Sequence, residues 1–269
     1  MNSLSNIKSR NSSQYRANRL LWSLFFSKRI SITIFLYFLS ILSVHSQNHY
    51  NFWNRIAVSH TLTENIKAEF EIQNRWQNDL YSNEKIWFED KLMNSFRLWM
   101  YYRIHDHLTL LISPISYFEN NPIIRNIGDE NKSLTYENRY SVLIERNVKI
   151  LPKTSFINKV GIEYRDFKNS APDYFRAREK LTFKYDLSSK YAVLAYDELF
   201  INCINKDGIT IFDQNRTGLS VNYTGIKNLK LELGYMYNYR SQRNTDVHLS
   251  ENNLTVNTYY SIPKKNKWT

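Results

Sequence analysis

Few residues in the sequence have the types and spacing that catalysis or metal binding requires. His105 and His107 stand one residue apart, so on an extended strand both imidazoles would face the same side and could hold a metal ion. Asp106 between them and the polar surroundings instead favour a solvated hairpin tip. The sequence has no Gly-rich phosphate loop, HExxH or GxSxG motif, and its single cysteine, Cys203, excludes an internal disulfide and a CxxC zinc site. We therefore predict no metal site and no cofactor.

A second pair, His248 and Ser250, also has the spacing that puts two side chains on one face of a strand. A nearby acid, Glu251, Glu232 or Asp246, is a candidate to orient the histidine so that it activates the serine for nucleophilic attack. The alternative interpretation is a polar rim beside a loop. We favour the rim, and the prediction is that the protein is not an enzyme and has no catalytic residues.

The positive charge of the chain is concentrated at one end. The formal net charge is +11, but the first 46 residues contain six basic and no acidic residues, so that segment alone contributes +6. Elsewhere basic residues alternate with apolar ones instead of forming a basic tract, which gives nucleic-acid binding little support.

The N-terminal segment has the pattern of a secretory signal peptide. A long basic region, residues 1–27, comes first. After Arg29 follows an apolar run, Ile30 to Val44, that is shorter than the roughly 20 residues needed to span a bilayer as a helix. We predict that residues 1–46 are a signal peptide, and the alternative is a retained N-terminal anchor helix.

Residues 47–269 repeat one pattern to the end of the chain. In 67–77, apolar side chains occupy one parity (Ala68, Phe70, Ile72) and charged or polar ones the other, which separates them onto two faces of a strand. Similar alternation occurs near residues 91–103, 139–145, 156–165, 175–185 and 229–240. Short polar breaks alternate with longer ones, as in an antiparallel meander whose ends face different compartments. The sequence therefore predicts a single all-β domain over 47–269.

Alternation alone does not say which face points inward. A soluble barrel packs its apolar face inside, whereas an outer-membrane barrel shows it to lipid. The export signal, the strand length and the aromatic residues near strand ends favour the membrane. These aromatic residues, expected in interfacial girdles, are Trp53, Trp76, Trp99, Tyr117, Tyr136, Tyr185 and Tyr259. We predict an antiparallel up-and-down transmembrane β-barrel of 10–12 strands. The strand count comes to about eleven, and because bacterial barrels normally have an even number we expect ten or twelve, with an extra strand near Ile86–Phe88 as one solution.

The charged parity of these strands then lines the lumen. We expect the side chains to point inward and pair, with Arg139 beside Glu137 and Arg165 beside Glu163, because an unpaired charge in a water-poor interior is costly. This predicted charge ladder, a candidate ligand-binding surface, comprises Glu71, Arg97, Glu137, Arg139, Glu163, Arg165, Arg176, Arg216 and Glu232.

Several segments resemble a known family. The stretches 212–216, 231–238 and 197–200 are similar to the uncharacterised outer-membrane barrel family designated domain of unknown function 2490, which is common in Bacteroidota. The resemblance covers about residues 50 to 262 and implies a fold and a location, the bacterial cell outer membrane, with outer-membrane lipid and the outer-membrane insertion machinery as partners. It implies no activity and no ligand.

Two classes of function follow. The first is a non-enzymatic barrel with a structural, docking or small-solute transport role. The second is a lipid-modifying outer-membrane enzyme, since His248 and Ser250 resemble the His-x-Ser pair of outer-membrane lipid A deacylases. An enzyme needs a nucleophile, a base and an orienting acid within hydrogen-bond reach, whereas a barrel needs only charge pairing across its lumen.

Overall fold

The strands of the chain follow from its alternating pattern. The computed structural model describes residues 48–79, 86–168, 172–203, 210–241 and 248–263. The predicted signal peptide therefore lies outside the described residues. The strands are β1 (Asn48–Thr61), β2 (Ile66–Gln77), β3 (Asp90–His105), β4 (Leu108–Asn120), β5 (Thr135–Leu151), β6 (Thr154–Phe167), β7 (Tyr174–Asp186), β8 (Tyr191–Asn202), β9 (Phe212–Ile226), β10 (Leu229–Ser241) and β11 (His248–Ser261). A short 3-10 turn, η1 (Ile127–Asp129), lies between β4 and β5. No helix in these ranges is long and apolar enough to cross a membrane.

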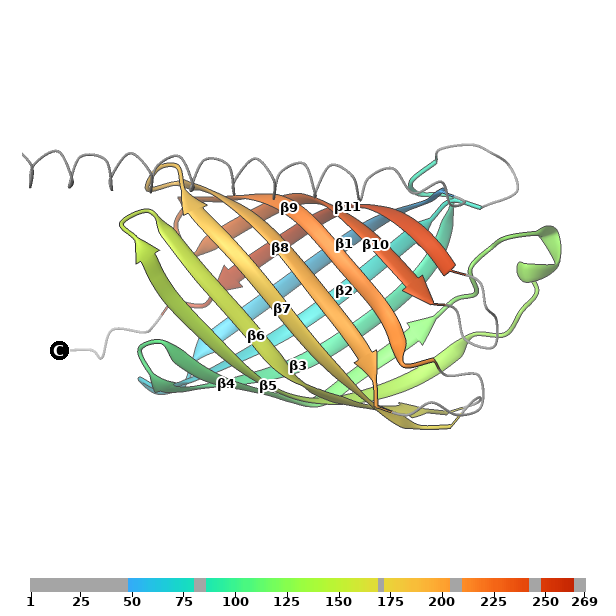
Figure 1. Ribbon diagram of the computed structural model, residues 1–269, viewed down its shortest axis with the longest axis horizontal. Helices are drawn as coiled ribbons and strands as arrows, with labels where there is room; N and C mark the ends of the chain where they lie inside the picture. The colour runs from blue at the N-terminus through green and yellow to red at the C-terminus, as the bar shows by residue number, and fades with distance from the viewer. Residues whose placement is uncertain (1–47, 80–85, 169–171, 204–209, 242–247, 264–269) are drawn as a thin grey trace, which may run out of the picture. The chain divides into compact units, whose positions relative to one another are not determined.

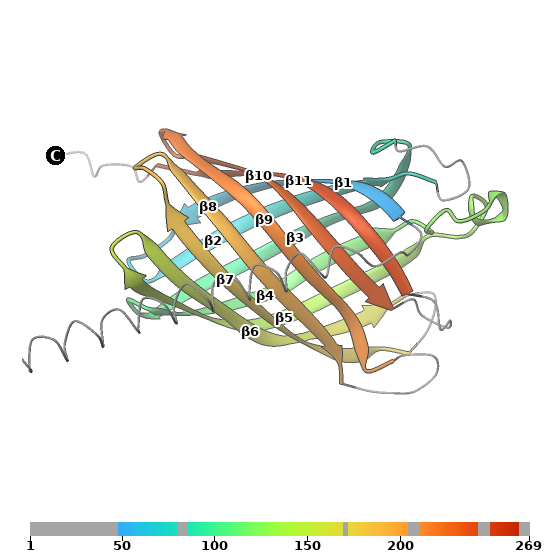
Figure 2. The same cartoon turned by 45° about the horizontal axis from the view of Figure 1, so that its top comes forward.

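The strands close into a barrel in which each strand pairs with its neighbours in sequence (Figures 1 and 2). Consecutive strands are antiparallel, and the ring closes where β1 pairs with β11 in parallel, with Phe52 opposite Leu254. In the described residues the barrel has eleven strands, a number within the predicted range of 10–12, but the expectation of an even number is wrong. Residues 86–89 form a turn and not an additional strand. With eleven strands, the first and last run in the same direction and can pair only in parallel.

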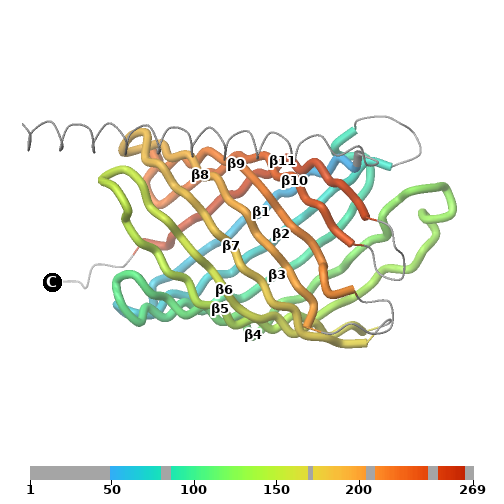
Figure 3. Tube along the Cα trace, viewed as in Figure 1, coloured from blue at the N-terminus to red at the C-terminus, as the bar shows by residue number. Residues whose placement is uncertain are grey.

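The connections differ between the two ends of the barrel. One end, here the short-turn end, has connections of two to four residues, such as 106–107 and 227–228. Asn228 has a φ of 62°, a left-handed conformation that asparagine tolerates in a tight turn. The other, long-loop end carries 78–89, 121–134, 168–173, 203–211 and 242–247. In Figure 3 the tube shows the connection 121–134 at one end of the barrel and β11 finishing at the other.

One of the long connections is organised around a buried carboxylate. Asp129 accepts hydrogen bonds from the backbone N–H of Arg125 and Asn126, at 3.0 and 3.1 Å, and pairs with Lys132. Burial alone would raise the pKa of Asp129, but these contacts stabilise the ionised form and hold it below its ordinary value. The connection 121–134 is therefore fixed by a charge at its centre.

The two faces of the wall have opposite chemistry. Apolar side chains of alternating residues point outward and are exposed, for example Val142 (51%), Ile162 (52%) and Leu233 (58%). Polar side chains of the other parity point inward and are buried, with Glu137 and Glu163 at 0% exposure. A water-soluble protein buries apolar groups and exposes charges, so this inverted arrangement is that of a transmembrane β-barrel.

Candidate functional site

The structure places all nine charged side chains of the predicted ladder on the inner face of the wall. Glu71, Glu137, Glu163 and Arg176 are buried, and Arg165 bonds to Glu137. The remaining four, Arg97, Arg139, Arg216 and Glu232, line a cavity in the middle of the lumen. The pairing between these residues is not uniform, and three arrangements occur.

The first arrangement centres on Glu137 of β5. Arg139 donates to both carboxylate oxygens, at 2.5 Å from Nε and 3.0 Å from Nη2. Arg165 of β6 does the same at 2.5 and 2.8 Å, and its Nη1 donates to the Tyr174 hydroxyl at 2.6 Å. Two forked guanidinium groups thus saturate one carboxylate. The expected pairing of Arg139 with Glu137 occurs. The sequence also predicted that Arg165 pairs with Glu163, but Arg165 pairs with Glu137 instead.

The second arrangement is a chain of ion pairs across β6–β9. Glu163 accepts from Arg176 at 2.5 Å and from Arg178 at 2.8 Å. Arg176 continues to Asp213 at 2.5 Å, and Arg178 continues to Glu198. Glu198 also faces Arg216 at 3.6 Å. Such buried groups tolerate their loss of hydration only because partners satisfy them, so removing one member leaves its partner buried and unpaired.

The third group has looser contacts. Glu71 faces Arg55 of β1 at 3.6 Å, and Glu232 accepts a hydrogen bond from Asn257 at 3.0 Å. Arg97 has no ion pair with any carboxylate in the described part of the chain, and it lies over the rings of Phe118 and Trp99. The predicted ladder is therefore a dense network on β5–β9 facing a sparser wall.

Sequence reasoning missed several inward-facing residues. Arg55, Arg75, Arg178, Glu198 and Asp213 belong to the interior yet were left out of the predicted ladder. Arg55, Arg75, Arg178 and Glu198 lie on the inward parity of their strands, so the alternation that selected the other nine carried the signal. Asp213 lies on the opposite parity of β9 and reaches Arg176 at an irregularity in the β8–β9 register, which no local alternation predicts.

Aromatic rings also line the lumen, contrary to the girdle expected for some of them. Trp53 is buried beneath Arg75, whose guanidinium carbon lies 3.4 Å from the ring centroid, and Trp99 and Tyr259 line a lumenal cavity. Their parity is that of the charged residues, which the sequence reasoning overlooked. Tyr117 and Tyr185 lie on the outer face as expected, where Tyr117 stacks on Phe96 and Tyr185 is exposed.

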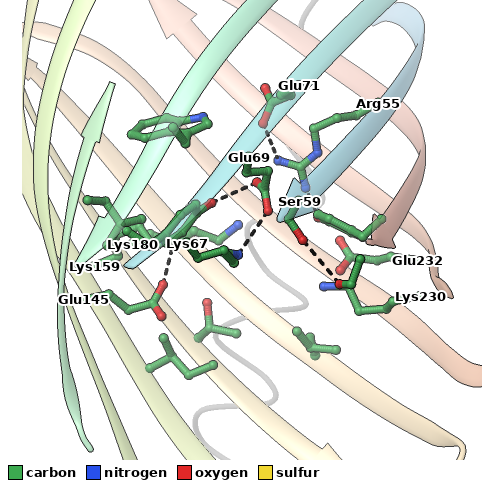
Figure 4. Close-up of a pocket in the computed structure, with 18 of the residues that line it drawn as sticks. Arg55, Ser59, Lys67, Glu69, Glu71, Glu145, Lys159, Lys180, Lys230 and Glu232 are labelled. Carbon is green, nitrogen blue, oxygen red and sulfur yellow. Dashed lines mark hydrogen bonds and ion pairs between the residues drawn. The ribbon is translucent and has the colours of Figure 1, made fainter. Parts of the chain in front are cut away.

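Two adjoining cavities occupy the lumen. The larger, here the vestibule, has a volume of about 590 Å³ and reaches the short-turn end, where Asn228, Leu229 and Ser261 line it. The smaller, here the inner chamber, has about 140 Å³ and lies deeper, next to Trp53, Phe200 and Met236. The two share seven lining residues: Arg55, Glu71, Arg97, Arg178, Lys180, Tyr196 and Glu232. Figure 4 shows the vestibule side chains converging from different strands, with Lys67 bonded to Glu69 and Lys159 paired with Glu145.

Towards the long-loop end the lumen is filled. His49, Gln77, Glu137, Asn238 and Glu251 have exposed fractions of 0–1%. His49 Nε2 lies 3.1 Å from Gln77 Oε1, and Asn238 donates to Glu251 at 2.6 Å. Gln77 also donates to the carbonyl of Pro122 in a long connection, at 2.8 Å. These contacts join the wall, the interior and a loop into one packed layer.

Comparison with known proteins places the chain in a family. Residues 50–248 match the family described as "Protein of unknown function (DUF2490)". The chain belongs to this family. No curated protein matches it.

The DUF2490 chain is similar to several solved β-barrels at low identity. The NanC porin is 10% identical with a TM-score of 0.47, over 80% of this chain and 98% of the porin. The translocator domain of the autotransporter NalP from Neisseria meningitidis is 17% identical with a TM-score of 0.43, over 67% of this chain and 70% of that domain. The KdgM porin, solved with disordered oligogalacturonate, is 11% identical with a TM-score of 0.39, over 70% of this chain and 88% of the porin.

The histidine pairs of this DUF2490 barrel lie outside the lumenal network. His105 ends β3 and His107 lies in the two-residue turn that follows, at the predicted hairpin tip. His248 begins β11 and stacks on Tyr239, with ring centroids 5.1 Å apart, while the Ser250 hydroxyl lies 2.8 Å from the Tyr237 hydroxyl. Of the candidate acids, Glu251 faces His49 and Arg240, Glu232 bonds to Asn257, and Asp246 lies outside the described residues.

Proposed function

We propose that the chain is a non-enzymatic outer-membrane β-barrel whose vestibule takes up small polar solutes from the short-turn end. In this proposal its outer face contacts outer-membrane lipid, and the insertion machinery of that membrane assembles it. The packed layer at the long-loop end closes the lumen in this conformation. The observation that carries the proposal is a roomy polar vestibule that ends against a filled, charge-paired interior.

The outer location is supported by the chemistry of the wall. A belt of exposed Val, Ile, Leu and Phe side chains surrounds the barrel, and water would penalise so large an apolar surface. Outer-membrane barrels place short turns on the periplasmic side and longer loops outside the cell. The vestibule of this barrel would therefore open to the periplasm.

The enzyme hypothesis has weaker support. A nucleophilic serine needs a base within hydrogen-bond reach and an acid to orient that base. Ser250 instead contacts Tyr237, and His248 stacks on an aromatic ring. Glu251, the nearest acid in sequence, contacts a different histidine, His49, at 3.7 Å.

The proposal is tested by thiol labelling of the vestibule. In a Cys203→Ser background, Thr182→Cys places a reactive thiol in the vestibule lining. A small membrane-impermeant thiol reagent should not reach this thiol in intact cells, because the packed layer blocks the long-loop end. It should label the thiol in outer-membrane fragments, where the short-turn end is accessible.

Two results would contradict the proposal. Rapid labelling of Thr182→Cys in intact cells would mean that the lumen is an open pore. Protection in the fragments would mean that the vestibule does not admit solutes. A heat-modifiable shift on gels confirms that the variant is folded in each case.

A further inference from the structure

The inner chamber has an excess of positive charge. Seven arginines and Lys180 line it, against four glutamates, Glu71, Glu163, Glu198 and Glu232. Some of these arginines already have a carboxylate partner: Arg176 and Arg178 both pair with Glu163, and Arg139 pairs with Glu137. The positive charge that is not paired in this way belongs to a few of the lining residues.

Arg75 and Arg97 form no ion pair with a carboxylate in the described part of the chain. Arg75 donates only to the amide oxygen of Gln73, at 3.1 Å, and lies over Trp53. Arg97 lies 4.6 Å from the ring centroid of Phe118. The Nε atoms of both arginines are buried and have no hydrogen-bond partner among the described residues. A buried guanidinium with an unused donor is unfavourable unless an acceptor reaches it.

Lys180 supplies a third cation from the opposite wall. It belongs to β7, whereas Arg75 and Arg97 belong to β2 and β3, and the ring order separates β7 from both. Its ammonium nitrogen lies 3.7 Å from the ring centroid of Tyr196 and forms no ion pair with a described carboxylate. Lys180 lines both cavities, so it stands where a solute would pass from the vestibule into the inner chamber.

We propose that Arg75, Arg97 and Lys180 form a binding site for a small multivalent oxyanion, a molecule with at least two carboxylate or phosphate groups. Cations on opposite walls favour an anion with more than one charged group, because one group can face each wall. Guanidinium groups suit carboxylate and phosphate oxygens because they donate in a planar fork. The inference rests on the proposed function, since the anion reaches the site through the vestibule.

The test is calorimetric titration of the folded barrel in detergent with two probes, sodium pyrophosphate and sodium citrate. At least one probe should bind saturably, and added NaCl should weaken that binding because salt screens the charges. Arg75→Gln and Arg97→Gln should each weaken it about tenfold or more, since a hydrogen bond to a charged group contributes more than a neutral one. Arg146→Gln, on the exposed outer face, is the matched control and should leave the affinity unchanged.

Absence of binding by both probes to the folded barrel would overturn the inference, and so would equal weakening by Arg146→Gln. The thiol-labelling experiment distinguishes failure of the proposed function from failure of the anion site. If Thr182→Cys is protected in outer-membrane fragments, the vestibule is closed to solutes and both proposals fall. If that thiol is labelled in the fragments but neither probe binds, only the anion site is wrong.

Discussion

Two glutamates each form ion pairs with two arginines inside the barrel. Glu137 and Glu163 each accept from two arginines and are fully buried. Pairs of this kind are not strongly stabilising in themselves, because desolvation offsets most of the attraction. Their loss is nevertheless costly, because the arginines remain buried without a partner.

Glu137→Gln should therefore destabilise the barrel by about 3–5 kcal/mol, since Arg139 and Arg165 both lose their counter-charge. The measurement is the urea concentration at which the heat-modifiable form unfolds in detergent. Glu145→Gln is the matched control: its pair with Lys159 is partly exposed, at 28% and 27%, so the change should be at most about 1 kcal/mol. Equal destabilisation by the two variants would show that burial of Glu137 does not increase the cost of losing its charge.

At this scale the sequence predicts which side chains face inward but not which of them pair. Alternation of parity is local, so it assigned Glu163 and Arg165 to one face correctly. Pairing depends on the register between strands and on side-chain reach, and so Arg165 contacts Glu137 of β5 instead. The aromatic residues were assigned by their position near strand ends and not by parity, and this misplaced Trp53 and Trp99.

The outer and inner faces of the strands should differ in how well they tolerate an added charge. Val142 and Ile162 are directly opposite each other on β5 and β6 and are exposed on the outer face. Thr182 of β7 is buried on the inner face and lines the vestibule. A charge added to the outer face must enter lipid, whereas one added to the vestibule meets polar groups.

Ile162→Arg should impair insertion, because a lipid-facing arginine near the midplane costs about 2–4 kcal/mol, and Thr182→Arg should be milder. The measurement is the fraction of each variant that folds into lipid vesicles, read from its heat-modifiable mobility. Equal impairment by both substitutions would indicate a two-sided soluble core and would contradict the assignment of the faces.

Strand identity was predictable from the sequence, but closure of the ring was not. The alternation defines each strand through its own residues, and the polar breaks define the turns. The β1–β11 contact joins residues about as far apart in the sequence as the barrel allows, with Asn51 donating to Asn253 at 3.1 Å. No local pattern encodes that contact, and the even number of strands was expected only because bacterial barrels normally have one.

The described barrel has an apolar outer face, a charged interior and two ends that differ in the length of their connections. β1 begins at the long-loop end, and β11 finishes at the short-turn end. Cys203, the only cysteine in the sequence, is exposed just after β8, at the long-loop end. The native chain thus carries one natural reporter of which end faces the cell exterior.

The orientation of the barrel is tested most directly by labelling Cys203 with a membrane-impermeant maleimide on intact Gram-negative cells that express the chain. Because Cys203 lies at the long-loop end, we expect it to be labelled in intact cells. Ser188→Cys in a Cys203→Ser background, in a short turn, should be labelled only after the outer membrane is disrupted. Labelling of Ser188→Cys in intact cells, or protection of Cys203 until disruption, would contradict a barrel that spans the outer membrane with its long loops outside.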